Sequence, residues 1–191
     1  MMRCNVFWKH ASRPGFLGWA RKKLKLRRKQ MAADYFLKID GIPGESAADS
    51  KHSGEISILS WSWGETQPVA PGPGGGGGGK VSMQDFRFSK AVDKSTPKLM
   101  LACASGQQIK DAVLSCRKAG GTSQDFLAVT LTEVTITSYE MAGNSGAAIG
   151  TTDQFALHFA KVQFNYLQQK PDGTTGERTH AGWDLTNNKP A

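Results

Sequence analysis

Residues 155–166 read FALHFAKVQFNY, a stretch in which apolar residues recur at every second position. Phe155, Leu157 and Phe159 alternate with other residues, as expected for a strand that buries one face. The alternation then changes parity, because the next apolar residues stand at positions 162, 164 and 166. A one-residue slip turns a strand inside out unless a bulge or a bend absorbs it. We therefore predict one long, bent strand over this stretch.

The same change of parity recurs in three other apolar segments. It falls between positions 58 and 59, between 83 and 86, and between 131 and 134. Four bent strands favour a strongly curled sheet, as in a small barrel whose strands pass between two packed sheets. One helix is also predicted, from the cap candidate Ser95-Thr96-Pro97 through an apolar run to Gly106. These patterns thus predict an all-β domain with one α-helix.

The net charge of +8 is unevenly distributed along the chain. Residues 1–30 hold ten of the 24 Lys and Arg residues and no acidic residue, which leaves 14 basic against 16 acidic residues in 31–191. We therefore divide the chain into a disordered basic extension, residues 1–30, and a domain, residues 31–191. The extension has the wrong order of charge and apolar residues for a secretory signal peptide. A misassigned start or leader before Met31 is favoured, and an arm that binds nucleic acid or membrane stays open.

Motifs for catalysis or metal binding fail when they are tested against their spacing. Gly74 to Lys80 matches a phosphate-binding loop, but Val81 stands where Ser or Thr is needed, and a strand pattern follows instead of a helix. The four histidines show no paired spacing for a metal, and no nucleophile elbow occurs. Cys103 and Cys116 are expected to be buried free thiols, and a disulfide between them stays open as the alternative. We expect no enzymatic activity, no cofactor, no metal and no membrane-spanning segment.

The domain resembles the Hcp family, the hemolysin-coregulated proteins that form the inner tube of type VI secretion systems. The resemblance begins with DYFLKIDGIPGES at residues 34–46 and runs in order almost to the end of the chain. Its other motifs are His52, Gly54-Glu55-Ile56, Ser60-Trp61-Ser62-Trp63-Gly64, Asp85-Phe86-Arg87-Phe88, Pro97-Lys98-Leu99 with Cys103 and Gly106, and Ala181-Gly182-Trp183-Asp184-Leu185.

The resemblance implies a two-sheet β-barrel subunit with one helix, and six such subunits form a ring with a wide channel. Rings of the family stack into a tube that a contractile sheath expels, so the implied partners are further copies of the chain and sheath, spike and baseplate proteins. Effectors carried in the channel are further implied partners. The resemblance does not imply nucleic acid as a partner. The implied location is cytoplasmic before firing and extracellular, or inside a target cell, afterwards.

Two sets of candidate site residues follow from a stacked, cargo-carrying tube. A wet channel should be lined by polar side chains on the strand faces away from the core, for which the candidates are Ser57, Ser60, Ser62, Thr130 and Thr132. The polar loop at 41–54 is the candidate contact between stacked rings, through Glu45, Asp49, Lys51 and His52. Two alternatives remain, a monomeric barrel that binds a small ligand and a nucleic-acid binder that acts through residues 1–30.

Overall fold

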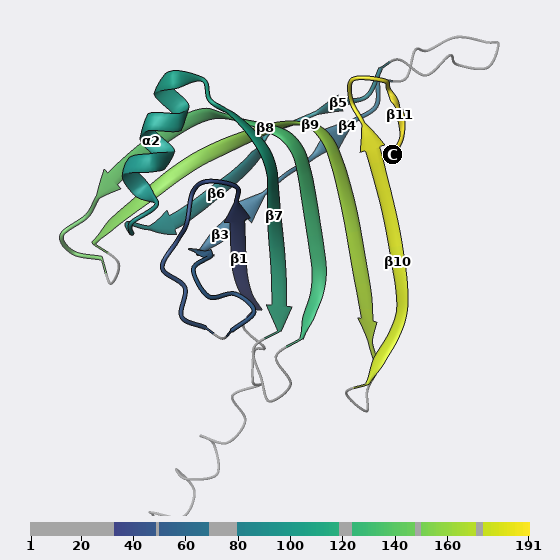
Figure 1. The fold of residues 1–191 in the computed structure, drawn as a ribbon, viewed down its shortest axis with the longest axis horizontal. Coiled ribbons are helices and arrows are strands. Elements are labelled where there is room, and N and C mark those ends of the chain that lie inside the picture. The colour runs from purple at the N-terminus through teal and green to yellow at the C-terminus, as the bar shows by residue number, and fades with distance from the viewer. Residues whose placement is uncertain (1–32, 49, 69–79, 119–123, 148–149, 171–173) are drawn as a thin grey trace, which may run out of the picture. The chain divides into compact units, whose positions relative to one another are not determined.

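The computed structural model describes residues 33–48, 50–68, 80–118, 124–147, 150–170 and 174–191. These residues belong to one unit of the chain, Ala32–Ala191 (Figure 1). Residues 1–30, Asp49 and most of the glycine-rich run lie outside the described residues. The elements are β1 (Ala33–Ile39), β2 (Ile56–Ile58), β3 (Ser60–Ser62), β4 (Glu65–Thr66), β5 (Ser82–Met83), β6 (Phe86–Ala91), α2 (Thr96–Ser105), β7 (Gln108–Lys118), β8 (Asp125–Gly143), β9 (Thr151–Gln169), β10 (Thr175–Asp184) and β11 (Lys189–Pro190).

Nine strands form one sheet that curls around the core, and β4 and β5 form a separate two-stranded ribbon. The central strand is β9, which pairs along its length with β8, through its N-terminal half with β6 and through its C-terminal half with β10. From β8 the sheet continues through β7 and β1 to β2. β2 runs through Leu59 into β3, which pairs with β6, so the circuit of strands closes at a bend rather than by a single ladder. The predicted all-β, barrel-like fold is confirmed.

The parity slips predicted in β8 and β9 are one bend shared by both strands. Leu131 lies opposite Val162, and Val134 lies opposite Phe159, and all four side chains are buried. Between them stands Glu133, whose φ of 55° is in the left-handed region. Residues other than glycine adopt this conformation rarely, and here it bends the strand while the register with β9 is kept, so that both halves bury their apolar residues. The change of parity after Ile58 corresponds to a bend at Leu59. Before this bend β2 pairs with β1, and after it β3 pairs with β6.

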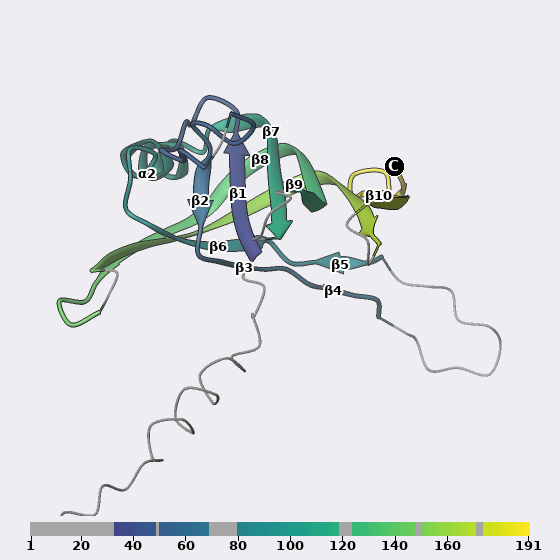
Figure 2. The ribbon, with the colours of Figure 1, turned by 90° about the horizontal axis from the view of Figure 1, so that it is seen from below.

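An aromatic cluster fills the space between the two sides of the curled sheet. Phe86 is fully buried, and its ring lies 5.2 Å from Trp63, 5.6 Å from Phe159 and 6.1 Å from Phe88. Ring separations of this size are typical of favourable aromatic packing. Figure 2 shows β3 and β6 on one side of this core and β7, β8 and β9 on the other. We call the first side the β3–β6 wall and the strands β7 to β10 the β7–β10 wall.

Helix α2 begins and ends where the sequence predicts, with Ser95 in the N-cap position, a proline in the first turn and Gly106 at the C-cap. Gly106 adopts φ 61°, and the last carbonyls accept hydrogen bonds from Gly106 and Gln107. Ser95 was the predicted cap, but its side chain makes no capping bond, because its hydroxyl donates instead to Asp93 at 2.5 Å. The helix buries Leu99 and Ala102. Within the described residues, no helix is long and apolar enough to cross a membrane.

A buried ion pair fixes the start of this helix to the sheet. Lys90 and Asp153 are both fully buried, and the Lys90 ammonium lies 2.8 Å from the Asp153 carboxylate. The ammonium also contacts Asp93 at 2.8 Å, and the hydroxyls of Thr96 and Tyr139 donate to Asp153. Burial, together with the bond and the charge of Asp153, raises the pKa of Tyr139 to about 12, so its hydroxyl stays protonated as a donor.

Candidate assembly surfaces

The loop at 41–54 is held against the sheet by His52. The imidazole is 2% exposed and stacks on Phe36 of β1, with ring centroids 4.5 Å apart. Its Nδ1 lies 2.7 Å from a carboxylate oxygen of Glu55, and its Nε2 lies 3.1 Å from Asp125. The predicted role of His52 as a direct contact between rings does not fit this burial. His52 instead positions the loop that carries the other candidates.

Asp125 is the acidic residue that the basic side chains around this loop contact. It accepts hydrogen bonds from Lys51, from His52 and from the Arg117 Nε at 3.0 Å. Burial alone would raise the pKa of Asp125, but these hydrogen bonds and the charge of Lys51 outweigh it and hold the pKa below its usual value. The same negative charge, together with burial, raises the pKa of the Cys116 thiol to about 12. Cys103 and Cys116 are both free.

The remaining loop candidates lie at the surface. Glu45 is exposed, and its carboxylate accepts the backbone N–H of Lys94 at 2.9 Å, which joins the loop to the segment before α2. The Lys51 side chain is 65% exposed although its ammonium pairs with Asp125. Asp49 lies outside the described residues. Gly44 allows the loop to pass close to β2, since a Cβ there would stand 2.3 Å from the Glu55 carbonyl oxygen.

The channel candidates fall on two different walls. Thr130 and Thr132 lie on the outer face of the β7–β10 wall, where their neighbours across the ladder include Gln163 and Lys161. Ser60 and Ser62 lie on the β3–β6 wall, opposite Ser89 and Arg87. Ser57 is exposed on β2, beside Phe36 of β1. A subunit can turn only one of the two walls toward a channel, so the five candidates cannot all line it.

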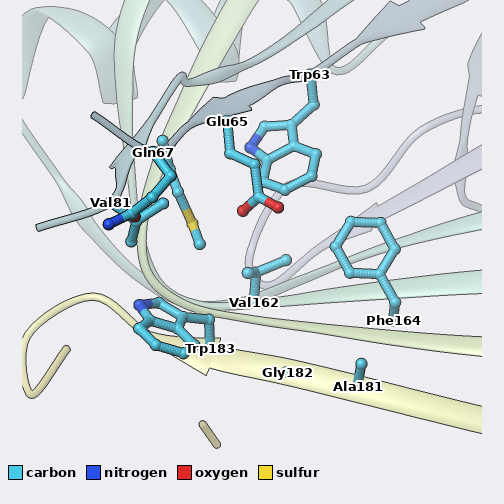
Figure 3. A pocket seen from close by; sticks show the side chains of 10 residues that line it. Trp63, Glu65, Gln67, Val81, Val162, Phe164, Ala181, Gly182 and Trp183 are labelled. Atoms are coloured by element: carbon cyan, nitrogen blue, oxygen red, sulfur yellow. The ribbon is translucent and has the colours of Figure 1, made fainter. Parts of the chain in front are cut away.

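One surface had no counterpart among the sequence predictions. A groove of about 750 Å³ lies between the β4–β5 ribbon and the C-terminal parts of β9 and β10 (Figure 3). Its walls include Trp63, Met83, Phe164 and Trp183. The tryptophans were visible in the sequence only as apolar residues of strands. Alternation assigns such residues to the core face, but this face extends past the part of the curled sheet that is covered by other strands, so some of it stays exposed.

A further polar cluster joins the segment before β6 to β8 and β9. His158 lies on the non-core face of β9 as predicted, and its Nδ1 lies 2.9 Å from Asp85, which also accepts the Thr137 hydroxyl at 2.6 Å. Within the described part of the chain, no group of three or more His, Cys, Asp or Glu residues could hold a metal ion.

The comparisons with known proteins agree with the fold. The family of the type VI secretion system effector Hcp matches residues 36–166. The chain belongs to the Hcp family. Protein hcp1 of Pseudomonas aeruginosa is 46% identical over 164 residues, which cover 84% of this chain and 100% of the relative. This Hcp chain is a component of the type VI secretion tube and a structural protein, and Hcp is a secreted protein of that system.

Solved structures place the same fold in other members of the family. Hcp1 from Salmonella typhimurium has a TM-score of 0.70 at 35% identity, over 84% of this chain and 100% of that one. A type six secretion system protein has a TM-score of 0.79 at 28% identity, with the same coverage of both chains. The resemblance in the sequence is thereby confirmed, and neither a monomeric ligand-binding barrel nor a nucleic-acid binder is favoured.

Proposed function

We propose that six copies of the chain close into a ring, that rings stack into the expelled tube, and that the outer face of the β7–β10 wall lines the channel. The observation that carries the orientation is the composition of this face. In successive rows of the ladder, Thr130 lies between Val113 and Gln163, and Thr132 lies between Asp111 and Lys161. Apart from Val113, the side chains in these two rows are polar or charged, which keeps a channel wet and gives passing cargo little apolar surface to adhere to.

The stacking contact is the loop at 41–54. Glu45 and Lys51 present opposite charges at its surface, and Asp49 stands between them in the sequence. Head-to-tail contacts of this kind generate open stacks, whereas contacts that close by rotation generate rings. His52 and Asp125 stabilise the loop in one conformation, which lowers the entropy lost when a neighbouring ring docks.

The finer parts of the proposal follow from membership of the family. The partners are sheath, spike and baseplate proteins, together with effectors carried in the channel. The chain resides in the cytoplasm before firing, takes no cofactor and catalyses no reaction. Its tube-forming domain spans residues 31–191, with residues 1–30 as a separate basic extension.

Negative-stain microscopy beside size-exclusion chromatography of the full chain tests the ring. We expect rings with a central hole and a species near six times the 20.6 kDa of one chain. A monodisperse monomer at high concentration would contradict the proposal and would favour the alternative, a monomeric barrel that binds a small ligand.

A further inference from the structure

Helix α2 carries an apolar stripe on the side that faces solvent. Pro97, Met100, Leu101 and Ala104 are all exposed, Met100 to 49% and Leu101 to 62%. Positions i, i+3, i+4 and i+7 share one face of a helix, so these four residues form a continuous surface. A single exposed apolar residue is ordinary, but a contiguous apolar surface marks an interaction site.

The groove beside the β4–β5 ribbon is a second incomplete surface. The Trp63 ring stacks on Phe86 at 5.2 Å and lies tilted against Phe164 at 5.3 Å. Trp183 of β10 also lines the groove (Figure 3). Among the described residues, the indole N–H groups of Trp63 and Trp183 are the buried side-chain atoms that have no hydrogen-bond partner. Buried polar groups in folded proteins are nearly always paired, and each exception costs free energy. In the single subunit, the groove therefore leaves two buried hydrogen-bond donors without an acceptor.

The stripe and the groove lie at opposite ends of the sheet. Helix α2 packs on β8 at one end, while β4, β5 and the C-terminal end of β10 stand at the other (Figure 1). Two different surfaces at opposite ends of one chain permit a heterologous contact, in which each copy uses its stripe on one neighbour and its groove on the other. Such contacts form a ring when the rotation between copies closes.

The charges of the two surfaces are complementary. Glu65 is the charged residue among the described residues that line the groove. Lys98 is the charged residue of α2, and Lys94 lies one turn before it, with both side chains exposed. An ammonium that approaches along the helix would meet the carboxylate as the apolar stripe enters the groove. Complementary charges of this kind fix the register of an interface and exclude wrong partners.

We propose that the groove receives helix α2 of the neighbouring copy within the ring. This inference rests on the proposed ring and names the surfaces that hold it together. Met100 and Leu101 enter between Trp63, Phe164 and Trp183, and Lys98 pairs with Glu65. The contact buries the two apolar surfaces that the single chain leaves in water, and burial of apolar area is the main favourable term in association.

Two variants that each block one surface test the contact. Leu101→Asp puts a charge on the stripe, and Ala181→Asp puts one into the groove; both residues are exposed, so the fold is kept. We expect each variant alone to be monomeric by native mass spectrometry. Their mixture should give a dimer of one copy each, joined through the one intact stripe and the one intact groove. Met141→Asp, at a side chain exposed to 58% outside both surfaces, is the matched control and should form rings.

A charge swap gives an independent measurement of the same contact. Glu65→Lys and Lys98→Glu should each raise the concentration needed for ring formation about five- to tenfold, and the double variant should recover most of this loss. If Leu101→Asp forms rings, or if the mixture of Leu101→Asp and Ala181→Asp stays monomeric, the contact between α2 and the groove is wrong. The proposal that the unaltered chain forms a ring would not be affected. Failure of the unaltered chain to form rings would overturn the proposed function, and the inference with it.

Discussion

Asp153→Ala is expected to lower the free energy of unfolding by about 3–5 kcal/mol, because it leaves Lys90 as a buried cation without its main partner. Both side chains are fully inaccessible to solvent, so water cannot replace the lost carboxylate. The substitution also removes the acceptor of the Thr96 and Tyr139 hydroxyls, which tie α2 and β8 to β9. Urea unfolding at one fixed protein concentration measures the loss, since assembly adds a concentration-dependent contribution.

A double variant separates the ion pair from general damage to the core. Lys90→Met removes the cation, so the pair Lys90→Met with Asp153→Ala should lose less than the sum of the two single losses. Glu140→Gln, an exposed carboxylate on β8, serves as the control and should change stability by less than about 0.5 kcal/mol. Additive losses in the double variant would show that the buried pair does not act as a unit.

Asp125→Asn is expected to cost about 1.5–3 kcal/mol at pH 7 and to release the loop at 41–54. The substitution takes a charged acceptor from His52 and Arg117, whose side chains are 2% and 5% exposed. The pKa of Asp125 in the folded chain is lower than in the unfolded chain, so its carboxylate stabilises the fold above about pH 4. This stabilisation is lost as the pH falls through the folded-state pKa.

The difference between the unaltered chain and Asp125→Asn should therefore shrink as the pH falls below about 4. Urea unfolding at pH 7 and near pH 3 measures the two differences, and hydrogen exchange at residues 50–55 reports the loop. Asp40→Asn changes an exposed carboxylate near the start of the same loop and should be nearly neutral at both pH values. An equal difference at both pH values would show that the charge of Asp125 does not stabilise the loop.

Alternation predicted an all-β domain because one face of each strand must be buried, whereas the two-sheet barrel was implied by the family resemblance. The change of parity in FALHFAKVQFNY corresponds to a bend in β9. The change of parity in β8 is a bend at Glu133, which lies opposite the bend in β9. Pairing itself was not predictable, because a period of two says which face is buried but not which strand lies alongside. The path from β2 through Leu59 to β3 therefore became visible only in the structure.

The candidate sites were predicted less completely, for two physical reasons. Alternation identifies the residues that face away from the core, but Ser60 and Thr130 do so on different walls, and no local pattern says which wall meets a channel. Charged and polar residues in a sequence suggest a surface, yet Lys90 and His52 are buried because partners distant in the sequence satisfy them. Only the exposed members of the loop at 41–54 remain candidates for direct contact.

The orientation of the subunit in its ring can be seen directly. A cryo-electron microscopy map of the assembled ring should place the β7–β10 wall on the channel, with Thr130 and Gln163 facing the lumen. It should also place α2 of each copy against the β4–β5 ribbon of the next copy. A ring whose channel is lined by Ser60 and Ser62 of the β3–β6 wall would contradict the account.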